Sequence, residues 1–135
     1  MQRFWNRLSK ARRIIFRVMR LFLARLRLGR AALPGHVDLG SSIRLSATDG
    51  GTLRIGPQSV IDKGAVIIVK HGNLQIGPRG FIGQGSIIAA RDAIIIGCDA
   101  LIAEYVTIRD QDHAINGPGP FDRNGFVTAP IRIGD

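Results

Sequence analysis

Hydrophobic residues recur at a fixed spacing of six between residues 53 and 108. The position after each recurring isoleucine is mostly Gly, Ala or Asp, and a small residue or valine lies four positions after the first two of each set. A fixed period of this kind predicts a solenoid, and six-residue repeats favour a parallel β-helix. The nine isoleucines form three sets of three: Ile55, Ile61 and Ile67; Ile76, Ile82 and Ile88; Ile96, Ile102 and Ile108.

The period predicts a triangular coil of three short strands with the isoleucines inside. Successive coils stack about 4.8 Å apart, so the isoleucines form continuous inner columns. Ile55 and Ile76 are 21 residues apart, and Ile76 and Ile96 are 20 apart, whereas three hexads span 18. We therefore expect the extra residues to bulge at one corner, at Lys70–Asn73 and Ala90–Asp92. An antiparallel sandwich is disfavoured, because alternation with period two does not place isoleucine every six residues.

A different pattern, that of an amphipathic helix, covers about residues 3–27. This stretch is rich in Leu, Arg and Ala, and no Gly or Pro precedes Gly29,. Its longest apolar run is the four residues Leu21–Ala24, so neither a signal peptide nor a spanning helix is predicted,. One predicted face is apolar and the opposite one is basic. The apolar face holds Phe4, Leu8, Ala11, Ile15, Val18, Phe22 and Leu26, and the basic face holds Arg3, Arg7, Lys10, Arg17, Arg20 and Arg27.

The net charge of +9 arises from this segment alone. Residues 1–30 hold ten Arg or Lys and no acid, whereas residues 31–135 hold nine basic and ten acidic residues, a balance of −1,. We divide the chain into a basic amphipathic helix (1–30) and a repeat domain (31–135). We expect residues 1–28 to make peripheral contact with an anionic membrane. Packing on the repeat domain or on a neighbouring subunit is the alternative, and no nucleic-acid partner is predicted because no recognised module follows.

Both ends of the repeat region are irregular. Residues 29–38 are predicted to be a linker, and Leu39-Gly40 with Ile43 and Leu45 a degenerate first coil,. Residues 109–130 break the register, and Ile133 resumes it 25 residues after Ile108, so we expect a protruding loop of the kind that often carries function,. Residues 129–135 repeat the opening of earlier coils and then stop. We interpret the chain as a fragment that ends two residues into a hexad.

The candidate catalytic residue is His113, which opens this loop. A neutral imidazole is the usual base for taking a proton from a hydroxyl near neutral pH. The neighbouring carboxylates Asp110 and Asp112 are candidates for fixing its tautomer. The single cysteine, Cys98, has no base near it in sequence and is interpreted as a turn residue. One cysteine allows no disulfide within the chain, which fits a reducing, cytoplasmic location, including the inner face of a membrane.

The hexads, the segment D-x-D-H-x-I at 110–115 and T-A-P-I-x-I-G-D at 128–135 together resemble hexapeptide-repeat acyltransferases. Within that family they are similar to sugar O-acetyltransferases of surface-polysaccharide biosynthesis. The resemblance implies an all-β, left-handed parallel β-helix, acetyl-CoA as donor, a sugar or glycan acceptor and a homotrimer with donor grooves between subunits. It also implies that His113 is the general base.

The chain departs from the family pattern in two respects. Some members place an asparagine opposite the histidine one coil earlier, a position that falls near Ser86 here, so this helper is missing or replaced. The coils that hold much of the CoA groove in the family would follow Asp135, so no cofactor-binding residue is assigned. We expect the 135-residue fragment to be weak or inactive by itself.

Two alternatives belong to other functional classes. A structural or catalytically incomplete β-helix scaffold is the first, although it would not need the register-breaking loop with D-x-D-H. A γ-type carbonic anhydrase-like metalloenzyme is the second. It requires three zinc-binding histidines that include a close pair, whereas His36, His71 and His113 are 35 and 42 residues apart,. No metal is therefore predicted.

Overall fold

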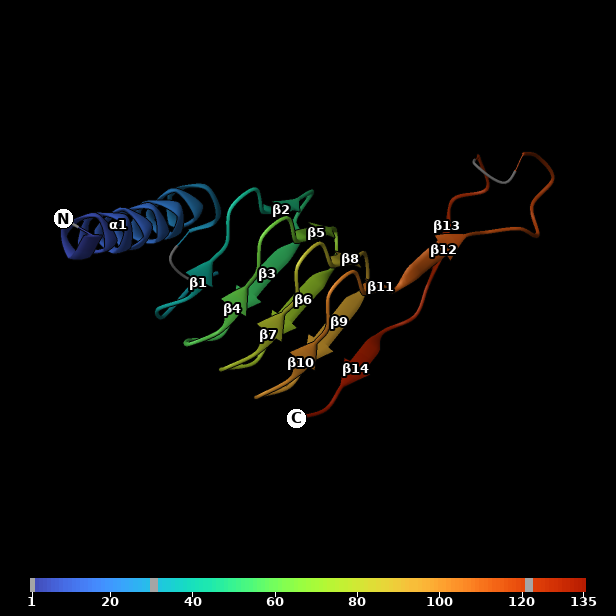
Figure 1. The fold of residues 1–135 in the computed structure, drawn as a ribbon. Helices are drawn as coiled ribbons and strands as arrows, with labels where there is room; N and C mark the ends of the chain where they lie inside the picture. The colour runs from blue at the N-terminus through green and yellow to red at the C-terminus, as the bar shows by residue number, and fades with distance from the viewer. Residues whose placement is uncertain (1, 30–31, 121–122) are drawn as a thin grey trace.

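The predicted solenoid is confirmed by a computed structural model, which describes residues 2–29, 32–120 and 123–135, with side chains from Arg12 onward. The chain forms a parallel β-solenoid of about three turns, preceded by one helix in the described part (Figure 1). The helix is α1 (Gln2–Leu28). The strands of the first two coils are β1 (Asp38–Leu39), β2 (Arg44–Thr48), β3 (Thr52–Ile55), β4 (Val60–Ile61), β5 (Val66–Lys70) and β6 (Asn73–Ile76). The later strands are β7 (Phe81–Ile82), β8 (Ile87–Ala90), β9 (Ala93–Ile96), β10 (Leu101–Ile102), β11 (Thr107–Arg109), β12 (Gln111–His113), β13 (Phe126–Thr128) and β14 (Ile131–Ile133).

The strands form the three walls of a triangular coil. In the described residues the parallel sheets are β1-β4-β7-β10, β2-β5-β8-β11 and β3-β6-β9-β14, so each strand pairs with its equivalent in the next coil. Ile82 lies between Ile61 and Ile102 in the first wall. Ile133 pairs with Ile96 in the third wall, which confirms that the segment after the loop resumes the register.

The inner columns form a dry core, as the spacing predicts. Ile55, Ile61, Ile67, Ile82 and Ile88 are fully buried. The small residues between the isoleucines also point inward, and Ser59, Ala65 and Ser86 are the fully buried examples. Glycine follows an isoleucine for a steric reason that Gly77 illustrates. A Cβ atom there would lie 2.4 Å from the carbonyl oxygen of Gly97 in the next coil.

Equivalent corners of successive coils stack on one another. The predicted bulges are confirmed as the short turns between β5 and β6 and between β8 and β9. At another corner Arg79 and Asp99 both adopt left-handed backbone conformations, with φ of 58° and 55°. The guanidinium of Arg79 donates two 2.6 Å hydrogen bonds to the carboxylate of Asp99. These bonds and the positive charge lower the pKa of Asp99 from its ordinary value,.

The predicted linker is wrong for residues 32–37, which belong to the solenoid. Leu33 and Val37 are fully buried, and the Ile55 amide donates to the carbonyl of Ala32 at 2.8 Å. Leu33 is six residues before Leu39, which pairs with Ile61 in the first inner column. The hexad pattern therefore begins about one coil before the first isoleucine set, with leucine at the inner positions Leu33, Leu39 and Leu45. Leucine fills the same space, so the coil tolerates the exchange.

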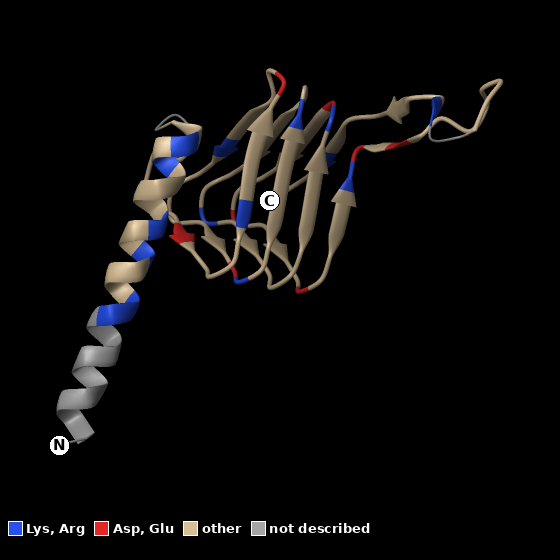
Figure 2. Ribbon diagram, turned by 90° about the horizontal axis from the view of Figure 1, so that it is seen from above, with Lys and Arg blue, Asp and Glu red and all other residues tan. Residues whose placement is uncertain are grey.

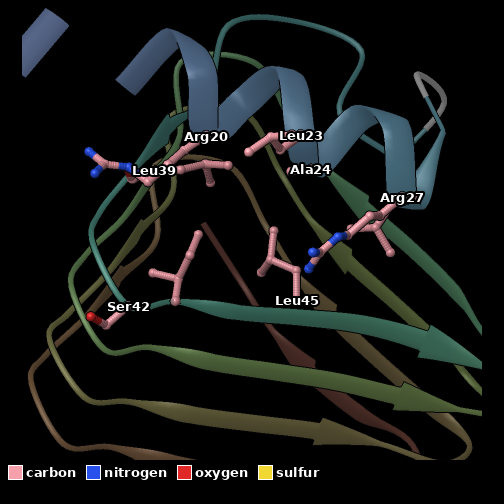
Figure 3. A pocket seen from close by; sticks show the side chains of 9 residues that line it. Arg20, Leu23, Ala24, Arg27, Leu39, Ser42 and Leu45 are labelled. Atoms are coloured by element: carbon pink, nitrogen blue, oxygen red, sulfur yellow. The ribbon is translucent and has the colours of Figure 1, made fainter. Parts of the chain in front are cut away.

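Helix α1 covers the open end of the first coil. Leu21 is buried there, and Ala24 and Leu28 pack against the same core. Figure 3 shows Leu23 and Ala24 of the helix above Leu39 and Leu45 of the coil, around a pocket of about 180 Å³. Of the alternatives left open by the sequence, packing of the helix on its own repeat domain is confirmed.

Arginines fasten this helix to the backbone of the coil. Arg20 Nε donates to the carbonyl of Leu39 at 2.8 Å. Arg25 donates to the carbonyls of Leu33 at 3.1 Å and Gly35 at 2.6 Å. In a terminal coil alternate backbone groups point toward a neighbour that is absent, and each buried carbonyl needs a donor. The arginines supply these donors.

The described helix α1 is not apolar enough over any sufficient length to cross a bilayer.

Candidate functional site

The register-breaking segment forms a hairpin arm that leaves the solenoid at the last coil. Strand β12 pairs antiparallel with β13, and the arm projects from the end of the molecule opposite to α1 (Figure 1). The Ala114 amide donates to the carbonyl of Gly125 at 3.1 Å, which extends the pairing by one step. The predicted protruding loop is thus confirmed, and a short two-stranded stem holds the candidate histidine.

Asp110 fastens the base of this arm to the solenoid wall. Its side chain is almost fully buried, and its two carboxylate oxygens accept hydrogen bonds from the backbone amides of Arg91 and Asp92, each at 2.8 Å. Its carbonyl accepts the Ala129 amide at 2.9 Å, where the chain returns from the arm. A charged acceptor that satisfies two backbone donors makes strong hydrogen bonds. These contacts give Asp110 a structural role, while its predicted action on the tautomer of His113 stays a prediction.

We expect Asp110→Ala to destabilise the chain by about 1.5–3 kcal/mol, because it leaves the two corner amides without their charged acceptor. Urea denaturation measures the free energy of unfolding. Asp112→Ala is the matched control, since the Asp112 carboxylate is exposed and accepts only the adjacent His113 amide among the described contacts. Equal stabilities of the two variants would contradict the anchoring role.

His113 lies on β12 directly opposite Phe126 on β13. The two ring centroids are 4.6 Å apart and the rings are tilted by 34°. The guanidinium carbon of Arg91 lies 3.7 Å from the centroid of Phe126, in cation–π contact,. Directly opposite residues of an antiparallel pair are close enough for such side-chain packing. The half-buried imidazole of His113 is therefore held beside an aromatic ring that an arginine from the solenoid corner also contacts.

The other predicted site residues lie in different surroundings. The Ser86 hydroxyl is buried in the coil wall, donates to the carbonyl of Ala103 at 2.8 Å and accepts the Val106 amide at 3.2 Å. These bonds join successive coils, so Ser86 has a structural position in the wall. Cys98 is half-buried after a repeat glycine, as the sequence predicts for a turn residue.

Two residues of the candidate site, Arg91 and Phe126, were missed by sequence reasoning. Arg91 lies in one of the predicted corner bulges, and Phe126 lies in the loop, but neither position carries a motif. Only the hairpin register brings Phe126 opposite His113, and only the stacking of the coils brings Arg91 to the base of the arm. No signal in the sequence alone links the three.

Within the described ranges, no group of three His, Cys, Asp or Glu side chains is placed so that it could hold a metal ion.

Comparison with known proteins finds no relative of this chain. No family model matches it, and neither a curated protein nor a solved structure is significantly similar to it. The structural class is a parallel β-solenoid with a helical N-terminal cap and a hairpin arm at the last coil.

Proposed function

We propose that the protein is an acyltransferase that moves an acetyl group from acetyl-CoA to a sugar hydroxyl, in the synthesis of a cell-surface polysaccharide. The observation that carries the proposal is the placement of His113 in the hairpin stem that leaves the last coil, with its ring packed on Phe126. A general base must be held in a defined orientation to act on a hydroxyl. The hexad spacing and the D-x-D-H segment support the same class.

The proposed reaction needs one base and no covalent enzyme intermediate. His113 accepts the proton of the sugar hydroxyl while the oxygen attacks the thioester carbonyl of acetyl-CoA. The tetrahedral intermediate then expels the CoA thiolate, which takes the proton back from the imidazolium. The products are the acetyl ester and CoA with a free thiol. All atoms and charges balance without a metal or a redox partner.

The proposal includes a homotrimer whose donor grooves lie between subunits. The outer surface of the first wall supports this, because Val60, Phe81 and Leu101 form an apolar column there through the parallel register. Leu101 is exposed in the single chain, and Ile87 of the second wall is exposed as well. Apolar surface on a flat wall favours packing against another copy. Sedimentation equilibrium tests the trimer.

A non-catalytic scaffold is the main alternative, and donor binding separates the two. Isothermal titration calorimetry measures the affinity for CoA of the whole protein and of its His113→Ala variant, at matched concentrations. Binding of CoA by both forms, with acetyl transfer strongly reduced in the variant, is the expected result. A protein that binds no CoA would be a scaffold.

We expect Cys98→Ser to retain full acetyl-transfer activity, because the proposed reaction forms no thioester on the protein. The thiol is half-buried at a coil corner. The initial rate of CoA release, followed with a thiol reagent in a coupled assay at saturating acetyl-CoA, is the measurement. Loss of transfer in a Cys98→Ser protein of unchanged stability would indicate covalent catalysis instead.

A further inference from the structure

Helix α1 presents its predicted apolar face outward, away from the solenoid. The helix contacts the first coil through the side that carries Arg20, Leu21 and Ala24. The apolar face lies on the other side of the helix, because residues separated by 100° per position place it roughly opposite. Its described residues, here called the outer apolar face, are exposed to 62%, 58%, 60% and 67%: Ile15, Val18, Phe22 and Leu26.

This arrangement differs from that of an ordinary surface helix, because the larger apolar face is the exposed one. A helix that only caps a core buries its apolar stripe and exposes its charges. Here Leu21 packs on the coil, and Arg20 and Arg25 donate to its carbonyls. The four large apolar side chains of the outer apolar face, at spacings of three and four, face solvent. Met19 and Leu23 beside them are also exposed. An apolar stripe of this length, left uncovered by the fold, indicates a further binding surface.

The charge of the helical segment identifies the class of partner. Residues 1–30 hold ten basic residues and no acid. Figure 2 shows basic residues along the described part of α1 without an acidic residue between them. Arg12, Arg13 and Arg27 are exposed. Arg12 lies three residues before Ile15 and therefore borders the outer apolar face,. An apolar stripe on a helix that carries only positive charge matches the boundary between acyl chains and anionic headgroups.

Two other partners fit these observations less well. A second copy of the helix would bring ten further cations against the first ten, and this repulsion opposes the packing of the two apolar stripes,. A nucleic acid would complement the cations, but its phosphate backbone offers nothing to cover Ile15, Val18, Phe22 and Leu26.

We infer that the outer apolar face binds an anionic membrane surface and that the solenoid stands on the membrane by its capped N-terminal end. Because Arg20 and Arg25 fix the helix to the first coil, the bound helix would orient the whole domain. The hairpin arm would then point away from the bilayer, since it lies at the opposite end of the molecule (Figure 1). This inference is independent of the proposed acetyl transfer.

Co-sedimentation with vesicles tests the inference on the whole chain. Vesicles of phosphatidylcholine with phosphatidylserine are compared with vesicles of phosphatidylcholine alone, at low and at raised salt. We expect strong binding to the anionic vesicles that weakens with salt, and weak binding to the neutral ones. Equal partitioning to both kinds, or no binding to either, would overturn the inference.

The double variant Val18→Ser, Phe22→Ser removes apolar contact and keeps every charge. We expect it to bind anionic vesicles about tenfold to a hundredfold more weakly, as the loss of a buried aromatic side chain implies. Its thermal stability should match the wild type, because both side chains are exposed. The control variant Tyr105→Ser, Ile115→Ser changes two exposed residues of the last coil and the arm and should bind as the wild type does.

A second pair of substitutions tests how much the positive charge of the helix contributes to vesicle binding. Arg12→Gln should weaken binding to anionic vesicles about fivefold and leave binding to neutral vesicles unchanged, whereas Arg13→Gln, on the opposite side of the helix, should weaken it less. If Val18→Ser, Phe22→Ser binds vesicles as tightly as the wild type, the outer apolar face is not the membrane surface. If that variant instead loses self-association in sedimentation velocity, the face is a subunit interface and the inference fails.

Discussion

The substitution His113→Ala is expected to lower the turnover of acetyl transfer by roughly 10²–10⁴, the usual contribution of one general base. The imidazole is held on the stem of the arm by its cross-strand neighbour Phe126, so its removal leaves the arm without a group that takes the hydroxyl proton. Initial rates of the whole protein, with acetyl-CoA and a panel of sugar acceptors, are the measurement.

Two controls make this result specific for catalysis. The affinity for CoA should remain nearly unchanged in His113→Ala, because the proposal places the donor mainly on the coils. Phe126→Ala should lower turnover less than His113→Ala, since it loosens the ring of the base without removing it. A His113→Ala protein with full activity would exclude the proposed mechanism, and a large loss of CoA affinity would place His113 in the donor site instead.

Ile82→Ala is expected to destabilise the solenoid by about 2–5 kcal/mol. Ile82 is fully buried and lies in register between Ile61 in the coil before and Ile102 in the coil after. Truncation removes apolar contacts with both coils and leaves a cavity that short, hydrogen-bonded strands cannot close. Urea denaturation followed by circular dichroism measures the difference in the free energy of unfolding.

The matched control for this substitution is Ile115→Ala in the arm. Ile115 is exposed, so the same change in chemistry should alter stability by no more than about 0.5 kcal/mol,. A loss below that value for Ile82→Ala would mean that the register of the inner columns is wrong.

Much of the fold can be predicted from the hexads, because an isoleucine at every sixth position is buried only when it points into a triangular coil. The spacing predicted the strands, the inward small residues such as Ala65, the corner bulges and the return of the register at Ile133. The position of the first coil was partly missed, because Leu33 and Val37 occupy inner positions without the isoleucine pattern. The arm was predicted as an insertion, but its antiparallel pairing was not.

The candidate site was predictable only in part. His113 could be singled out from its place after the last full hexad, since a register break marks an insertion in any regular solenoid. Arg91 and Phe126 could not, because they meet at the arm only through the stacking of coils and the pairing of β12 with β13. For Asp110 the sequence offered a neighbour of the histidine, whereas the structure shows a carboxylate that anchors the corner amides.

The N-terminal helix shows most clearly which properties follow from the local sequence and which depend on tertiary structure. Its sequence by itself determined that it is helical, amphipathic and strongly basic, because these properties depend on residue type and on spacing along one helix. Only the tertiary structure decided which side faces the solenoid. The first coil meets the side of the helix that carries Leu21 and Ala24, and on that side Arg20 can also donate to the carbonyl of Leu39,. The apolar side therefore remains outside.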